Sequence, residues 1–179
     1  MIPHTPSFLI AAAASFVGLG EDGADNHGQM VELFLREVRQ PPGEPWCAAF
    51  VHHVGYWSHF DHQIGKSSWP LPATASCYDL GDFARQHKLI RTEPRAGDVF
   101  LLYFKELRRF AHTGIVVSVD SCISSDDDAA FVCTTIEGNT NADGTRNGRL
   151  TLRKTRRFSI RNGDRYIRWA ETNINAEAA

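Results

Sequence analysis

The hydrophobic patterning changes character near residue 93, and this change constrains the fold more than any other feature of the chain. Helical segments are predicted before it, at 7–20, at 29–38, from about 46 to 57 and near 75–87. Strand-like apolar runs follow it, at 93–104, 111–120, 129–140 and 150–170, the last holding one or two strands. Helices that come first and strands that come second predict an α+β fold with an antiparallel sheet.

The composition is that of one soluble globular domain. Of the 179 residues, 42% are hydrophobic and 22% are charged, which excludes extended disorder, collagen and a coiled coil. A formal net charge of −2 gives no global attraction to nucleic acid. Basic residues do gather between 153 and 168. They alternate through strand-like sequence, so we interpret them as a solvated sheet face rather than a nucleic-acid surface.

Neither membrane insertion nor a secretory signal is expected. The longest apolar stretch, from Phe8 to Leu19, is too short to span a bilayer and is predicted to be a buried first helix. No Lys or Arg precedes it, and Glu21 and Asp22 follow at once, unlike a secretory signal. We therefore expect synthesis in the cytoplasm without a signal peptide. The four cysteines include no CxxC pair, so neither a disulfide framework nor a structural zinc site is predicted.

The segment PWCAAFV holds the strongest candidate nucleophile. Cys47 follows Pro45 at the predicted first turn of an apolar helix. Unpaired N–H groups and the helix dipole favour negative charge at that end, so they favour the thiolate, which is the reactive form. The alternative is a buried cysteine of a core helix, since cysteine is commonly buried.

A thiolate nucleophile needs a base, and His112 is the best candidate. It opens the strand-like run AHTGIVV, which places its ring at the rim of the sheet, where a helix N-terminus can face it. The alternative is a solvated surface histidine. The spacing of His52 and His53 from the thiol on the same helix carries both away from it. His59 and His62 have no third ligand nearby, so no metal site is predicted.

The base in turn needs an acceptor that orients its ring. Glu137 and Asn139 end a strand-like run in TIEGNTN. Alternation along a strand puts both on one face, so either is expected to reach the imidazole. The alternative is a polar turn, which the Gly and Asn content of this segment also favours.

Four motifs in order, PWCAAFV, RAGDVFLLY, AHTGIVV and TIEGNTN, resemble the CHAP amidase/peptidase domain of the NlpC/P60 superfamily. The resemblance covers about residues 8–170, so the whole chain is expected to be a single CHAP-like catalytic domain. It implies a papain-like α+β fold in which N-terminal helices pack on an antiparallel sheet. It also implies a peptidoglycan hydrolase that cleaves an amide bond, either as an N-acetylmuramoyl-L-alanine amidase or as an endopeptidase.

By matched position, the resemblance makes Cys47 the nucleophile, His112 the base and Glu137 the third member, while Asn139 completes the site. Some family members bind calcium on an Asp-rich stretch before the cysteine. The sequence QPPGEPW stands there instead, so neither calcium nor any cofactor is expected.

The expected partner is bacterial peptidoglycan, and nucleic acid is not expected as a partner. Two biological settings fit the resemblance, namely a phage endolysin and a secreted antibacterial effector, which would have an immunity protein. In either setting the enzyme acts in the cell envelope or periplasm after release or delivery. The alternative from another class is a non-catalytic module on the same fold that binds the glycan or peptide of the cell wall.

Overall fold

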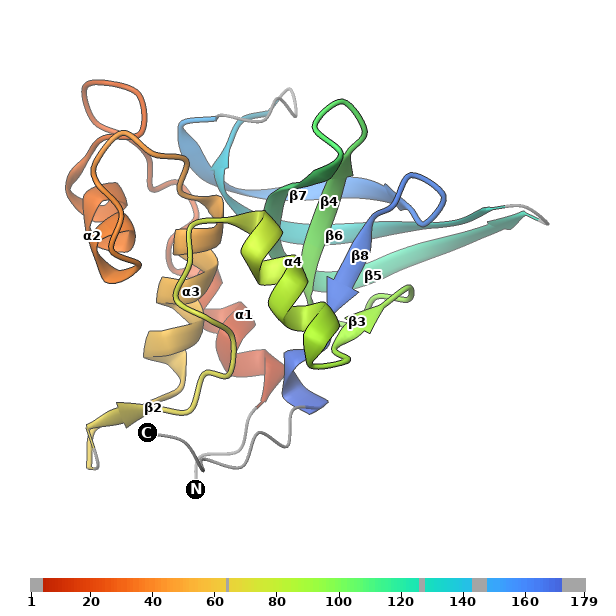
Figure 1. Cartoon of the computed structure of the whole chain (residues 1–179), viewed down its shortest axis with the longest axis horizontal. Coiled ribbons are helices and arrows are strands. Elements are labelled where there is room, and N and C mark those ends of the chain that lie inside the picture. Colours follow the sequence, from red (N-terminus) through yellow and green to blue (C-terminus); the bar gives the residue numbers. More distant parts are fainter. Residues whose placement is uncertain (1–4, 64, 126–127, 143–147, 172–179) are drawn as a thin grey trace.

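The computed structural model describes residues 5–63, 65–125, 128–142 and 148–171. Its helices gather on one side of a six-stranded sheet (Figure 1). Every strand pair in that sheet is antiparallel. The predicted α+β class and antiparallel sheet are therefore confirmed.

The helices lie close to the predicted ranges. The α-helices of the described residues are α1 (Pro6–Ala14), α2 (Gln29–Glu37), α3 (Cys47–Ser58) and α4 (Cys77–Gln86). A short 3-10 helix, Trp169–Glu171, lies near the C-terminal end of the described residues. None of the helices in these residues is long and apolar enough to cross a membrane.

The first helix is shorter than predicted. It ends at Ala14, whereas the apolar pattern predicted a helix as far as residue 20. Beyond it the chain turns and pairs with the edge of the sheet. The N–H of Gly18 donates to the carbonyl of Thr151 at 2.9 Å, and the N–H of Thr151 donates to the carbonyl of Leu19 at 2.7 Å. Hydrogen bonds to a strand edge thus replace the last turns of the predicted helix.

The strands of the large sheet follow the order β3-β8-β4-β5-β6-β7. Their bounds are Ile90–Arg91 (β3), Val99–Phe104 (β4), Arg109–Ser125 (β5), Asp128–Thr140 (β6), Leu150–Ser159 (β7) and Arg165–Ile167 (β8). A separate two-stranded ribbon, β1 (Phe60–Asp61) and β2 (Lys66–Ser67), lies between α3 and α4, where no strand was predicted. The far end of the β5–β6 hairpin extends away from the helices (Figure 1).

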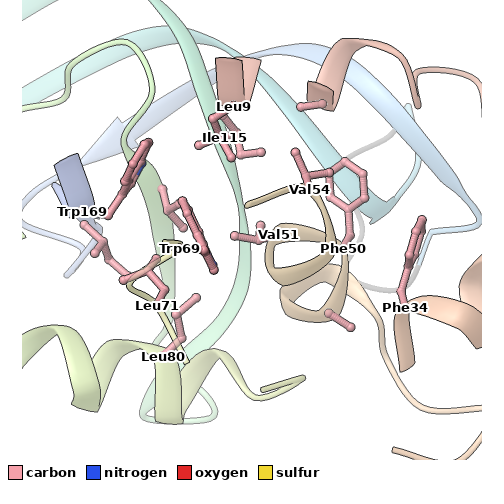
Figure 2. Packing of buried hydrophobic residues seen from close by; sticks show 14 of the residues in the cluster. Leu9, Phe34, Phe50, Val51, Val54, Trp69, Leu71, Leu80, Ile115 and Trp169 are labelled. Carbon is pink, nitrogen blue, oxygen red and sulfur yellow. The ribbon is translucent and has the colours of Figure 1, made fainter. Parts of the chain in front are cut away.

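Helix α3 lies at the centre of the core. It packs against α1, α2 and strands β5 and β6. Figure 2 shows Val51 directed toward Trp69, while Phe50 points to the opposite side, where Phe34 lies. The rings of Phe34 and Phe50 are 5.9 Å apart at an edge-to-face angle. Because α3 is buried from its first residue through Val51, its N-terminus is held rigidly against the sheet.

Candidate active site

Cys47 is the first residue of α3 and is buried, with 4% of its surface exposed. The first backbone hydrogen bond of this helix runs from the N–H of Phe50 to the carbonyl of Trp46, at 2.8 Å. The N–H groups of the three residues before Phe50 therefore have no acceptor within the helix. This places the thiol at the positive end of a 12-residue helix, as the sequence predicted.

His112 lies within β5, three residues after the strand begins, and not at its start as predicted. A β-bulge sits beside it. Leu102 of β4 pairs with His112, but Tyr103 pairs with Phe110, so Ala111 is an extra residue in this strand. Bulges of this kind redirect neighbouring side chains. The imidazole is 3% exposed, and its Nε2 lies 2.9 Å from Oε2 of Glu137 on β6.

Glu137 is fully buried and has hydrogen-bond partners on both carboxylate oxygens. Arg156 of β7 donates to it through Nε at 2.8 Å and Nη2 at 2.7 Å, in a bidentate pair. The hydroxyl of Thr135 donates to Oε1 at 2.7 Å. The carboxylate that faces His112 is thus also held by a guanidinium, which shares Oε2 with the imidazole.

Arg156 was not singled out by the sequence, because it belongs to the basic run interpreted as a solvated sheet face. Its neighbours Arg153 and Arg157 are exposed, as that interpretation requires. Arg156 instead shares a strand face with the partly buried Leu152 and the buried Phe158. Apolar residues at even spacing from a basic residue were the available signal that this one arginine points inward.

Asn139 does not lie beside Glu137, although alternation predicted a shared face. The register of β6 against β7 shifts between Glu137 and Thr140, and Asn139 has a left-handed backbone with φ of 55°. Its Oδ1 accepts the N–H of Trp46 at 3.3 Å, and its Nδ2 donates to Asn26 Oδ1 at 3.0 Å. The Asn139 side chain therefore anchors the start of α3. Of the two residues that were expected to reach the imidazole, Glu137 is the one that contacts it.

Gly138, which lies between these two residues, leaves no room for a side chain. A Cβ there would lie 2.6 Å from the Trp46 ring and 2.8 Å from the Phe50 ring. Any side chain would push α3 away from β6. In this segment Glu137 orients His112, Gly138 admits the helix and Asn139 holds the residue before the thiol.

A second cysteine lies next to the first. Cys77 is the first residue of α4, and its Sγ is 3.6 Å from Sγ of Cys47. Ser76 caps α4 by accepting the N–H of Asp79 at 3.2 Å. No sequence motif singled out Cys77. The Ser-Cys-x-Asp pattern, which places a thiol directly after a helix cap, was the signal that could have found it.

A cavity of about 250 Å³ opens over the two sulfurs. It is lined by residues of the loops before α3 and α4, of both helices, of β5 and of β6. His112, Asn139 and Gln40 are among the lining residues, and Gln40 is a candidate donor to a bound carbonyl. Glu44 also lines it and is exposed, so water screens the effect of its charge on the thiol.

The electrostatics favour an ion pair of Cys47 and His112. A hydrogen bond with Cys77, together with the hydrogen bond and charge of His112, holds the pKa of Cys47 well below its usual range in spite of burial. Burial alone would lower the pKa of His112, but hydrogen bonds with Cys47 and Glu137 raise it to about 9. Burial also acts against ionised Glu137, yet His112 and Arg156 hold the pKa of this carboxyl well below its usual range. These shifts together favour a thiolate on Cys47, an imidazolium on His112 and a carboxylate on Glu137.

Three further histidines of the described residues lie in different surroundings. Nδ1 of His53 is 2.7 Å from Oε2 of Glu37, and Nδ1 of His59 is 2.9 Å from the carbonyl of Gly55. His62 packs against Phe60, with ring centroids 5.0 Å apart. Across residues 5–63, 65–125, 128–142 and 148–171, no group of three or more His, Cys, Asp or Glu side chains is placed to hold a metal ion.

The arrangement has the parts that nucleophilic attack on a carbonyl requires. A thiol lies at a helix N-terminus, a histidine pairs with it, and a buried carboxylate orients that histidine, all beside a cavity. No family model, no curated protein and no solved structure matches the chain. The function is therefore inferred from the chemistry of the site and from the order of the four sequence motifs.

Proposed function

We propose that this chain is a cysteine hydrolase that cleaves an amide bond of bacterial peptidoglycan, with the papain-like fold of CHAP domains. The observation that carries the proposal is the His112–Glu137 contact beside the Cys47 thiol at the start of α3. This constellation supports acyl transfer by a thiolate. Peptidoglycan as the substrate rests on the resemblance of the four ordered motifs to the CHAP family.

In the first step the Cys47 thiolate attacks the scissile carbonyl carbon and forms a carbon–sulfur bond, while the carbonyl oxygen becomes an oxyanion. The imidazolium of His112 then donates its proton to the leaving amine, and the carbon–nitrogen bond breaks. The products of this step are a free amine and a thioester on Cys47. Glu137 remains ionised throughout and stabilises the imidazolium form of His112.

In the second step a water molecule attacks the thioester carbon. The neutral His112 accepts a proton from this water, and the carbon–sulfur bond breaks. The acyl group leaves as a carboxylic acid that ionises, and the thiolate–imidazolium pair is restored. Hydrolysis therefore requires only water as a co-substrate.

The oxyanion is stabilised at the N-terminus of α3. The backbone N–H of Cys47 has no acceptor within the helix and lies next to the attacking sulfur. The N–H of Trp46 is bonded to Asn139 Oδ1, so this group holds the helix start in place and does not bind the oxyanion. The side-chain amide of Gln40, which lines the cavity, is the proposed second donor.

The charge distribution favours an enzyme over a non-catalytic wall-binding module on the same fold. A binding groove gains nothing from a buried thiolate, whereas a nucleophile requires it. An endolysin and a secreted effector would use the same chemistry. An immunity protein would be a partner only of the effector. The proposed site of action is the bacterial envelope or periplasm.

The alkaline limb of the pH dependence of kcat/KM is expected near pH 9, which is the pKa of His112 in this site. Above it, the imidazolium loses the proton that the leaving amine needs. On the acid side, activity persists until the Cys47 thiolate is protonated, at a pH well below the usual thiol pKa. The measurement is kcat/KM on a soluble muropeptide against pH, together with the ultraviolet absorbance of the thiolate in the free protein. Cys47→Ser should abolish this absorbance, and an alkaline limb near neutral pH would contradict the ion pair.

The substrate assignment is tested by mass spectrometry of the fragments released from purified cell walls in heavy-oxygen water. One heavy oxygen in a new carboxyl group, paired with a new amine, is the expected result, and the fragment masses identify the bond. The matched control is Cys122→Ser, which removes an exposed thiol of β5. Intact walls after treatment with folded wild-type protein, with an amide bond cleaved in another polymer, would reject peptidoglycan as the substrate.

A further inference from the structure

Cys77 carries a buried nucleophilic thiol beside the active site, and the proposed mechanism does not use this thiol. Its exposed fraction is 6%, against 4% for Cys47, and the two sulfurs are 3.6 Å apart. This separation lies in the range of a hydrogen bond between sulfur atoms. Ala48 belongs to the same buried cluster, and Phe110 packs against it. An anionic sulfur in such apolar surroundings depends on the few donors that reach it.

Two features fix Cys77 in this position. Ser76 caps α4 through its hydroxyl, which defines where the helix and therefore the thiol begin. Gly81, one turn later, allows the helix to approach β5 closely, because a Cβ at this position would lie 2.5 Å from the Phe110 ring. The start of α4 is thus held over the start of α3 at the rim of the cavity.

The charges around the two sulfurs indicate which thiol donates the hydrogen bond between them. A thiolate can only accept hydrogen bonds, so one thiol must keep its proton for the two sulfurs to attract each other. Cys47 also receives the hydrogen bond of His112 and one from the backbone of Thr113, which favours the anion on this sulfur. A second thiolate 3.6 Å away would be repelled by the first. These contacts favour the proton on Cys77, which makes its S–H group the donor.

We propose that Cys77 is a positioning residue, whose S–H group donates a hydrogen bond to the Cys47 thiolate and holds that sulfur facing His112. The assignment rests on the proposed function, in which Cys47 is the nucleophile. Cys77 forms no bond to the substrate in this scheme, and its proton is not transferred. Its contribution is to stabilise the reactive form of Cys47 before the substrate binds.

The test compares donor and non-donor side chains at this position in the full-length protein. Cys77→Ala and Cys77→Val both remove the donor, and Ala underfills the site whereas Val slightly overfills it, so a packing defect and a lost hydrogen bond are separated. Cys77→Ser keeps a donor. The readout is the rate at which iodoacetamide alkylates Cys47 as a function of pH, with the labelled residue identified by mass spectrometry. Because alkylation needs no turnover, this readout does not depend on the substrate.

Loss of the donor is expected to move the midpoint of Cys47 ionisation upward by about one pH unit in both non-donor variants, which is a tenfold loss of thiolate on the acid side. Cys77→Ser should keep the midpoint close to that of the wild type. On a muropeptide, kcat should fall about tenfold at a pH below the midpoint, while KM stays unchanged. The titratable groups that line the cavity, His112, Arg109, Asp79 and Glu44, are the same in all variants.

The matched control is Cys122→Ser, which removes an exposed thiol of β5 that does not line the cavity. It should leave the midpoint unchanged. An unshifted midpoint in Cys77→Ala and Cys77→Val would overturn the assignment. A midpoint in Cys77→Ser shifted as far as in those two variants would also overturn it. A Cys47–Cys77 disulfide in the protein under the assay conditions would also overturn it. If the midpoint shifts in the non-donor variants but the wild-type protein leaves cell walls intact, the proposed function is rejected, while the hydrogen bond from Cys77 to Cys47 is supported.

Discussion

Cys47→Ala is expected to abolish cell-wall hydrolysis, with a loss in kcat of at least about 10⁴-fold, while the protein stays folded. The side chain supplies the attacking sulfur, and no acyl intermediate forms without it. Removal of a small buried side chain next to a cavity leaves the packing of α3 largely intact. The measurement is the release of soluble fragments from purified walls, with folding checked by circular dichroism.

Cys47→Ser is the near-isosteric comparison and is expected to be almost as inactive. A serine hydroxyl does not ionise at the pH at which the thiol does, so the ion pair with His112 is lost. Cys122→Ser should retain full activity, since its thiol is exposed and lies outside the cavity. Hydrolysis by Cys47→Ala at the wild-type rate would show that another group is the nucleophile.

Most of the fold could be predicted because long helices and strands carry a repeated pattern. Helix α3 and strand β6 lie within two residues of the predicted ranges. The strands that were missed, such as β3 (Ile90–Arg91), have two residues each, which is too short for any period to be read. These strands form through partners that are distant in the sequence, as β3 does with β8.

The three central residues of the site could also be found from local signals. Cys47 follows a helix breaker, and His112 and Glu137 lie in strand-like runs. Local signals could indicate that Arg156 points inward and that Cys77 begins a helix, but they could not identify what these two side chains contact. Those contacts depend on the register of β7 against β6 and on the approach of α4 to α3, which join segments distant in the sequence.

At Asn139, an irregularity in β6 breaks the alternation of side chains on which the sequence prediction relied. Strict alternation would place it on the same face as Glu137. The bulge before Thr140 and the left-handed backbone of Asn139 turn its side chain toward the start of α3 instead. Bulges of this kind are common beside active sites, so alternation is least dependable where the functional residues lie.

Glu137→Gln is expected to lower kcat about 10³-fold, because the amide cannot stabilise an imidazolium as a carboxylate does. Its NH₂ group would also meet the donors of Arg156 and His112, which now share one carboxylate. The unpaired Arg156 should cost about 3 kcal/mol in the free energy of unfolding. The measurements are kcat on a defined muropeptide and unfolding in urea.

Two further variants separate the loss of stability from the loss of catalysis. The double variant Glu137→Gln/Arg156→Met removes the unpaired charge, so it should recover stability without recovering kcat. Asp98→Asn provides the matched control, because Asp98 is a buried carboxylate paired with Arg168 at 3.1 Å and does not line the cavity. It should lower stability and leave kcat close to that of the wild type.

Asn139→Gly is expected to cost at least about tenfold less in kcat than Glu137→Gln, which is a difference of about 1.4 kcal/mol in the barrier. Glycine accepts the left-handed backbone, so only the side-chain hydrogen bonds are lost, whereas Asn139→Ala adds about 1 kcal/mol of strain. Loss of the bond to the N–H of Trp46 loosens the start of α3 and should appear mainly as reduced stability. If Asn139→Gly reduces kcat more than Glu137→Gln does, catalysis depends more on the placement of the α3 start, which Asn139 fixes, than on the orientation of His112 by Glu137.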